Sequence, residues 1–183
     1  MTGWLKVVSV GVLVGLAAQA GADDRQKRAF RAELVSYNEV PAVSSPARGQ
    51  FRAVVDEKGT SFTFWLTYKD LTFDASMAHI HFGQHHTNGG ISVWLCQSNV
   101  NPAPSSVAAR VAPCPLRATA TPVSATITAA DVLGPAGQGI APAEFAELVA
   151  AMRAGAAYAN VHSGVGGTAP VGFPGGEIRG QIN

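Results

Sequence analysis

Short runs of alternating apolar and polar residues, bounded by glycine, proline or small polar residues, recur along most of this chain. Such alternation is typical of β-strands, in which successive side chains point to opposite faces. The clearest run covers residues 61–68, in which Phe62, Phe64, Leu66 and Tyr68 share one face. A chain of many short strands buries these apolar faces by forming a sandwich or a barrel.

The runs predict most of the sheet directly. Residues 51–56 and 61–68 flank a short polar loop with a glycine, so we expect them to pair as a hairpin. A second pair is expected between residues 77–82 and 91–96, and the remaining strands over residues 30–37, 123–128, 158–162 and 177–182. The predicted fold class is mainly β, an antiparallel β-sandwich or partly closed barrel of about seven to eight strands with one short helical insertion.

One segment has the period of a helix instead of a strand. Between Pro142 and Gly155, apolar residues recur at three- and four-residue spacing: Phe145, Leu148, Val149 and Met152. Proline suits a first helical turn and glycine ends a helix, so a helix is expected over residues 142–153. Residues 131–134 are a further candidate helical turn, opened by Thr128.

Residues 1–22 have the pattern of a secretory signal peptide. Lys6 supplies the positive charge, residues 7–18 the apolar stretch, and residues 18–22 the small residues of a cleavage site. The apolar stretch is about 12 residues long, shorter than the ~20 that a membrane-spanning helix needs. We expect one domain over residues 30–183, secreted or periplasmic, without a membrane span after the signal is removed.

The charge of the chain narrows the class of partner. Removal of the signal takes away only Lys6 among the charged residues, so 13 basic residues become 12 against 12 acidic ones. A neutral chain lacks the positive field that favours nucleic acid or an anionic membrane. We therefore expect a protein or a metal ion as ligand, and no nucleic acid.

Cys96 and Cys114 are the cysteines of the chain. In an oxidising compartment they are expected to form a disulfide around a loop of about 19 residues, and such a bond stabilises a fold by about 3 kcal/mol. A metal site made of cysteine and histidine is the alternative. Residues 101–106 and 113–115 read as irregular loop that a disulfide would restrain.

His79 and His81 are the chief candidates for chemistry. Their spacing places both imidazoles on one face of the strand over residues 77–82, where together they can hold a metal ion. His162, in the predicted strand 158–162, is the leading third ligand. Three histidines with an open coordination position suit Cu or Zn, and Glu177 could orient a ring nitrogen or complete the ligand set.

The alternative is a structural role for these histidines. Buried imidazoles also brace strands by hydrogen bonds to backbone carbonyls, Glu177 or Arg179, and this is the commoner role of a His-x-His pair alone. His85 and His86 lie in the next loop and could reach a metal, although exposed loop histidines are usually only solvated. The sequence has no nucleophile elbow and no local triad pattern, so it predicts no catalytic residue.

Four short motifs stand in a fixed order along the chain: Ala32-Glu33-Leu34 with Asn38-Glu39-Val40-Pro41, Ala78-His79-Ile80-His81-Phe82-Gly83, Tyr158-Ala159-Asn160-Val161-His162-Ser163, and Gly176-Glu177-Ile178-Arg179-Gly180-Gln181. Together they resemble the CHRD (chordin) domain family, in its single-domain bacterial type. The resemblance covers residue 30 to the end and implies a β-rich domain. In chordin this domain belongs to an extracellular protein that binds growth factors, a role that is not carried over here. For the bacterial members of the family, the resemblance implies no enzymatic reaction.

The chain departs from the family pattern between residues 163 and 174, where a longer connection could shift Glu177 relative to His162. The His-x-His strand followed by Phe-Gly is also similar, locally, to copper-zinc superoxide dismutase. Because an evident bridging histidine and an aspartate-rich zinc loop are lacking, dismutase activity ranks last. The first hypothesis is an exported, non-enzymatic binding or structural module, and the second is a metal-binding protein using His79, His81 and His162.

Overall fold

The structure is a computed structural model that describes Met1, residues 27–165 and residues 171–183. The rest of the predicted signal peptide, residues 2–22, lies outside the described residues. Among the described residues, no helix is long and apolar enough to cross a membrane. The strands and the α-helix of the described residues are β1 (Ala29–Val35), β2 (Arg48–Val55), β3 (Ser61–Lys69), β4 (Ala75–Phe82), β5 (Gly90–Gln97), β6 (Val123–Thr128), α2 (Phe145–Arg153), β7 (Ala157–Val165) and β8 (Val171–Gln181).

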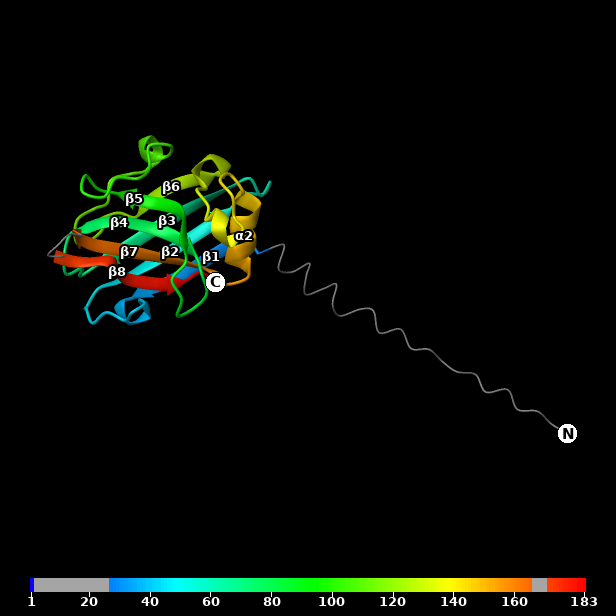
Figure 1. Ribbon diagram of the computed structural model, residues 1–183, viewed down its shortest axis with the longest axis horizontal. Helices are drawn as coiled ribbons and strands as arrows, with labels where there is room; N and C mark the ends of the chain where they lie inside the picture. Colours follow the sequence, from blue (N-terminus) through cyan, green and yellow to red (C-terminus); the bar gives the residue numbers. More distant parts are fainter. Residues whose placement is uncertain (2–26, 166–170) are drawn as a thin grey trace.

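The eight strands form one antiparallel sheet in the order β5-β4-β7-β8-β1-β2-β3-β6. The sheet bends back on itself, so that β5, β4, β7 and β8 pass in front of β6, β3, β2 and β1 in Figure 1. The result is a nearly closed, barrel-like sheet with its apolar interior between the two halves. This confirms the predicted fold class.

The alternation of the sequence explains which faces are buried. Along β2 and β3 every second residue is buried, and Phe51, Phe62, Phe64 and Leu66 have no exposed surface. The opposite half contributes Ile80, Val161 and Ile178 to the same core. The predicted hairpin of residues 51–56 and 61–68 is confirmed by the antiparallel register of β2 and β3.

Helix α2 covers one end of the sheet (Figure 1). Its apolar stripe faces the core as the spacing predicts, and the Phe145 ring packs against Phe62 with centroids 5.7 Å apart. The predicted start at Pro142 is wrong, because the helix begins at Phe145. Glu144 caps the preceding turn by accepting a hydrogen bond of 2.7 Å from the Ala141 amide.

The other differences are at element boundaries. Strand β1 ends at Val35, and Ser36–Asn38 turn as a 3-10 helix instead of continuing the strand. The predicted turn over residues 131–134 lies earlier, at Ala129–Asp131, where Thr128 and Asp131 form a capping box. Two further 3-10 helices span Ala108–Arg110 and Ala136–Gln138.

Cys96 and Cys114 form the expected disulfide. Cys96 is fully buried on β5, and the long β5–β6 connection is tied to this strand around Gln97. The Gln97 side chain donates to the carbonyls of Ala108 and Val111, and its backbone carbonyl accepts from the Cys114 amide. The disulfide and Gln97 together hold an otherwise irregular segment on the sheet.

Candidate metal centre

The face of β4, β7 and β8 that points away from the core is polar. Adjacent strands place His79 opposite Asn160, and Asn160 opposite Arg179. The next row of the same face is His81, Tyr158 and Gln181. These side chains are all buried, because loops cover this part of the sheet. The fold therefore has a second, polar interior outside its apolar core.

Arg179 holds the β4–β5 loop over this polar layer. Its guanidinium donates to the backbone carbonyls of Gln84 and Thr87 at 3.0 and 2.7 Å. The Arg179 Cζ atom lies 3.3 Å from the centre of the Tyr158 ring, and the His81 ring stacks with the same tyrosine at a centroid distance of 4.7 Å. A cation–π contact and a ring stack thus fix the orientation of His81.

His79, His81 and His162 converge beneath these loops. One ring nitrogen from each histidine lies within 4.8 Å of the others. His79 Nδ1 and His162 Nε2 are 3.2 Å apart, and both rings lie almost completely out of solvent. On the far side, the indole of Trp94 meets His79 edge to face at 4.2 Å. The two strands therefore bring three potential ligand atoms to one buried point.

Two backbone carbonyls define the protonation of these rings. His81 Nδ1 lies 2.9 Å from the Gly89 carbonyl oxygen, and His162 Nδ1 lies 2.8 Å from that of Pro174. A carbonyl oxygen only accepts, so each Nδ1 carries the hydrogen and each Nε2 keeps its lone pair. His162 Nε2 then accepts a hydrogen bond from His79 Nδ1 at 3.2 Å, and His81 Nε2 has no hydrogen-bond partner among the described residues. Metal-binding histidines typically have this arrangement, in which the second nitrogen donates to a carbonyl.

Burial keeps the three histidines uncharged. It lowers the pKa of His162 to about 4, against the opposing effect of the Pro174 hydrogen bond. Burial and the neighbouring imidazoles lower the pKa of His79 well below its usual value, and burial also lowers the pKa of His81. Neutral imidazole is the form that binds metals. His79 Nε2 and His81 Nε2 are buried and have no hydrogen-bond partner among the described residues.

Residues 30–182 match the CHRD domain. The chain belongs to the CHRD domain family. No curated protein and no solved structure matches the chain. Three of the four motifs that carry the family resemblance lie on the strands β4, β7 and β8. These strands supply the polar face described above. The CHRD motifs of this chain thus lie side by side in space.

Glu177 has its own hydrogen-bond partners in this CHRD domain. One carboxylate oxygen accepts from the amide and the hydroxyl of Thr72, and the other accepts from the Ser163 hydroxyl. Its oxygen atoms are not members of the group formed by the three histidines. These bonds join β8 to β7 and to the β3–β4 connection, so the geometry gives Glu177 a bracing contact.

Glu39 is a residue of the polar layer that the sequence analysis did not single out for chemistry. Its carboxylate lies against the backbone of Gly176, whose φ of 126° and close approach leave no space for a side chain. Burial raises the pKa of Glu39 to about 7, although the Arg179 guanidinium opposes this shift. The feature of the sequence that could have identified Glu39 is its place in the Asn38-Glu39-Val40-Pro41 motif.

Asn160 and Tyr158 were also missed as site residues. Both share the period-two face of β7 with His162, which is the signal that could have found them.

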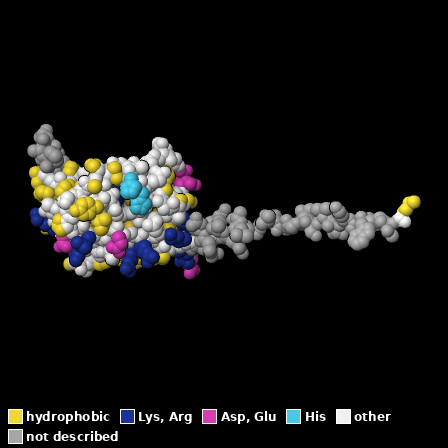
Figure 2. Space-filling view, turned by 90° about the horizontal axis from the view of Figure 1, so that it is seen from below, with side chains coloured by type: hydrophobic (Ala, Val, Ile, Leu, Met, Phe, Trp, Pro, Cys, Tyr) yellow, Lys and Arg dark blue, Asp and Glu magenta, His cyan; other side chains and the backbone are white. Residues whose placement is uncertain are grey.

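His85 and His86 lie outside the buried cluster. They are exposed in the β4–β5 loop, with ring centroids 5.5 Å apart, and histidine side chains reach the surface on the face shown in Figure 2. They are not members of the buried histidine group.

Proposed function

We propose that this CHRD domain is an exported, non-enzymatic binding protein whose His79, His81 and His162 hold one Cu or Zn ion. The convergence of three ring nitrogens within 4.8 Å of one another carries this proposal. An ion with bonds of about 2.0–2.1 Å holds two donors at most about 4.2 Å apart, so binding would draw in any ring nitrogen that lies farther away. Neutral imidazoles are ligands that suit both metals.

The environment of the three rings supports the same proposal. Two of them are oriented by carbonyls that leave the Nε2 lone pair unprotonated, and the third, His79, is fixed between His162 and Trp94. A buried nitrogen without a partner costs roughly 1–3 kcal/mol, and a bound metal would remove that cost. The fold would thus hold the ligands in place before the ion arrives.

We assign the site to binding and not to catalysis because of its burial. His79 has no exposed surface, and His81 and His162 are only 8% and 6% exposed. A catalytic metal needs an open coordination position that a substrate can reach. An ion held here would be shielded, as expected for binding, carriage or stabilisation.

Elemental analysis of the protein after Cu and Zn loading and removal of excess metal tests this function. We expect about one equivalent of metal in the natural protein and none in a His79→Ala/His81→Ala variant. The matched control is His85→Ala/His86→Ala, which removes two exposed histidines and should keep the full equivalent. Absence of retained metal in the natural protein, or its loss in the control, would contradict the proposal.

A metal-free binding or structural module is the second candidate. The observation that favours it is the pair of hydrogen bonds from His81 and His162 to Gly89 and Pro174, which tie two loops to the sheet. If the natural protein retains no metal while His81→Ala lowers its unfolding temperature, bracing is the role of the cluster. The signal-like residues 1–22 and the disulfide support export under both candidates.

A further inference from the structure

The outward face of β1, β2 and β3 is basic and lies on the half of the sheet opposite the histidine cluster. Its exposed positions include Arg31 on β1, Arg48 and Arg52 on β2, and Lys69 on β3. None of these four side chains forms an ion pair among the described residues. Glu33 is the acidic residue at the exposed positions of these strands, and it accepts a hydrogen bond of 3.1 Å from Gln50.

The register of the sheet sets these basic residues against each other. Arg31 on β1 is directly opposite Arg52 on β2, and Arg48 on β2 is directly opposite Lys69 on β3. Like charges opposite each other on neighbouring strands destabilise a sheet. Two such pairs on one face, with no carboxylate in ion-pair contact with them among the described residues, indicate that the positive charge meets an anion from outside.

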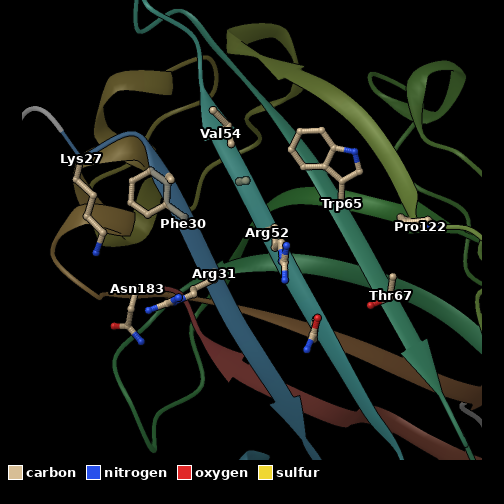
Figure 3. A pocket seen from close by; sticks show the side chains of 12 residues that line it. Lys27, Phe30, Arg31, Arg52, Val54, Trp65, Thr67, Pro122 and Asn183 are labelled. Atoms are coloured by element: carbon tan, nitrogen blue, oxygen red, sulfur yellow. The ribbon is translucent and has the colours of Figure 1, made fainter.

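This face is also hollowed. A concavity of about 890 Å³ is lined by residues that include Lys27, Arg31, Arg52, Trp65 and Asn183. Figure 3 shows the Trp65 ring and the Arg52 side chain on adjacent strands at this surface, with Arg31 on the next strand. The Trp65 side chain is large and apolar, yet 39% exposed. An aromatic side chain directly opposite Arg52 therefore lies open to solvent, with Arg31 one strand further on.

We propose that this basic face binds an acidic polysaccharide built of uronic acid units. Guanidinium groups form paired hydrogen bonds with carboxylates, and an exposed indole offers a flat apolar surface to the ring of a sugar. The two basic pairs lie four residues apart along β2, roughly 13 Å, which is the length of a short oligosaccharide. Nucleic acid is disfavoured, because its phosphates are much more densely spaced than the two basic pairs.

Affinity electrophoresis tests the proposal, with polygalacturonate as the acidic polymer and dextran as the neutral one. We expect the protein to be retarded by polygalacturonate but not by dextran, and the retardation to weaken with added salt. An Arg31→Glu/Arg52→Glu variant should bind about tenfold more weakly or worse. A Trp65→Ala variant should also bind more weakly, since it removes the stacking surface.

Lys58→Glu is the matched control, because it reverses an exposed charge in the turn between β2 and β3 without touching the concavity. It should bind as the natural protein does. Thermal unfolding of each variant separates loss of binding from loss of fold. A single Arg31→Gln substitution removes a like-charge pair, so it should weaken binding without lowering the unfolding temperature. Equal binding of the natural protein and the double variant would overturn the proposal. So would equal loss in Lys58→Glu, or stronger binding to single-stranded DNA or anionic vesicles than to polygalacturonate.

Discussion

His162 is kept neutral in the folded protein under conditions in which a free histidine is protonated. Its folded pKa is about 4, whereas a histidine in an unfolded chain titrates near 6.5. Between these two values the unfolded chain binds a proton that the folded chain does not. The free energy of unfolding is therefore at its full value above pH 6.5 and falls as the pH is lowered towards 4.

For His162 alone this loss amounts to about 3 kcal/mol over the window from pH 6.5 to 4. The measurement is urea unfolding of the metal-free protein at several pH values within this window. A His162→Gln variant should show a shallower decline, whatever its stability at pH 8. If natural protein and variant declined in parallel, His162 would not be a buried neutral group.

At the residue scale, the sequence predicts the positions of the histidines well and their surroundings poorly. Period-two alternation places His79 and His81 on one face of β4, and the structure brings His162 beside them. The contacts of Glu39 and Arg179 could not be predicted in this way, because they are with loops and non-adjacent segments. The ladder between β7 and β8 shifts register between Val161 and Ser163. The neighbours of Glu177 on β7 could therefore not be extrapolated from the alternation along β8.

At the element scale, the segment between β5 and β6 depends on its disulfide. Over most of its length it has no strand to pair with, apart from an isolated bridge between Gln97 and Pro113. Cys96 and Cys114 are 18 positions apart, and closing a loop of this length stabilises a fold by about 3 kcal/mol in the chain-entropy treatment. A Cys96→Ala/Cys114→Ala variant should unfold at a correspondingly lower urea concentration.

Mass spectrometry of the non-reduced protein provides the chemical check, with an expected deficit of two hydrogens relative to the reduced chain. The natural protein unfolded with a reductant present should match the alanine variant, and the variant itself should be insensitive to reductant. Two free thiols in the protein from an oxidising compartment would contradict the structure.

The strands β7 and β8 show why element lengths are harder to predict than element types. Residues 163–174 are rich in glycine and end in proline, which is typical of a loop. The structure instead continues both strands, pairing Ser163 with Phe173 and Gly164 with Gly172. Pairing with a neighbouring strand outweighs local preference here, and a single sequence shows no sign of that pairing.

At the scale of the whole molecule, the seam between β1 and β8 joins the two halves of the sheet. The ladder aligns Val35 with Arg179, and Arg31 and Asn183 exchange two backbone hydrogen bonds of 2.9 and 3.0 Å. Between these points the β8 backbone passes very close to β1. A β-carbon at position 180 would overlap the carbonyl oxygen of Glu33. Glycine at this position is therefore a condition for joining the two halves.

Gly180→Ala should separate the seam and destabilise the whole fold. Neither strand can move freely, since β8 is also paired with β7 and β1 with β2, so a loss of about 1–3 kcal/mol is expected, as for overpacked interiors. Gly175→Ala is the matched control, because a β-carbon there meets no atom within 4 Å, and its effect should stay within about 0.5 kcal/mol. Urea unfolding measures both. Equal stability of the two variants would mean that the halves are joined by their apolar core, and that the seam contributes little.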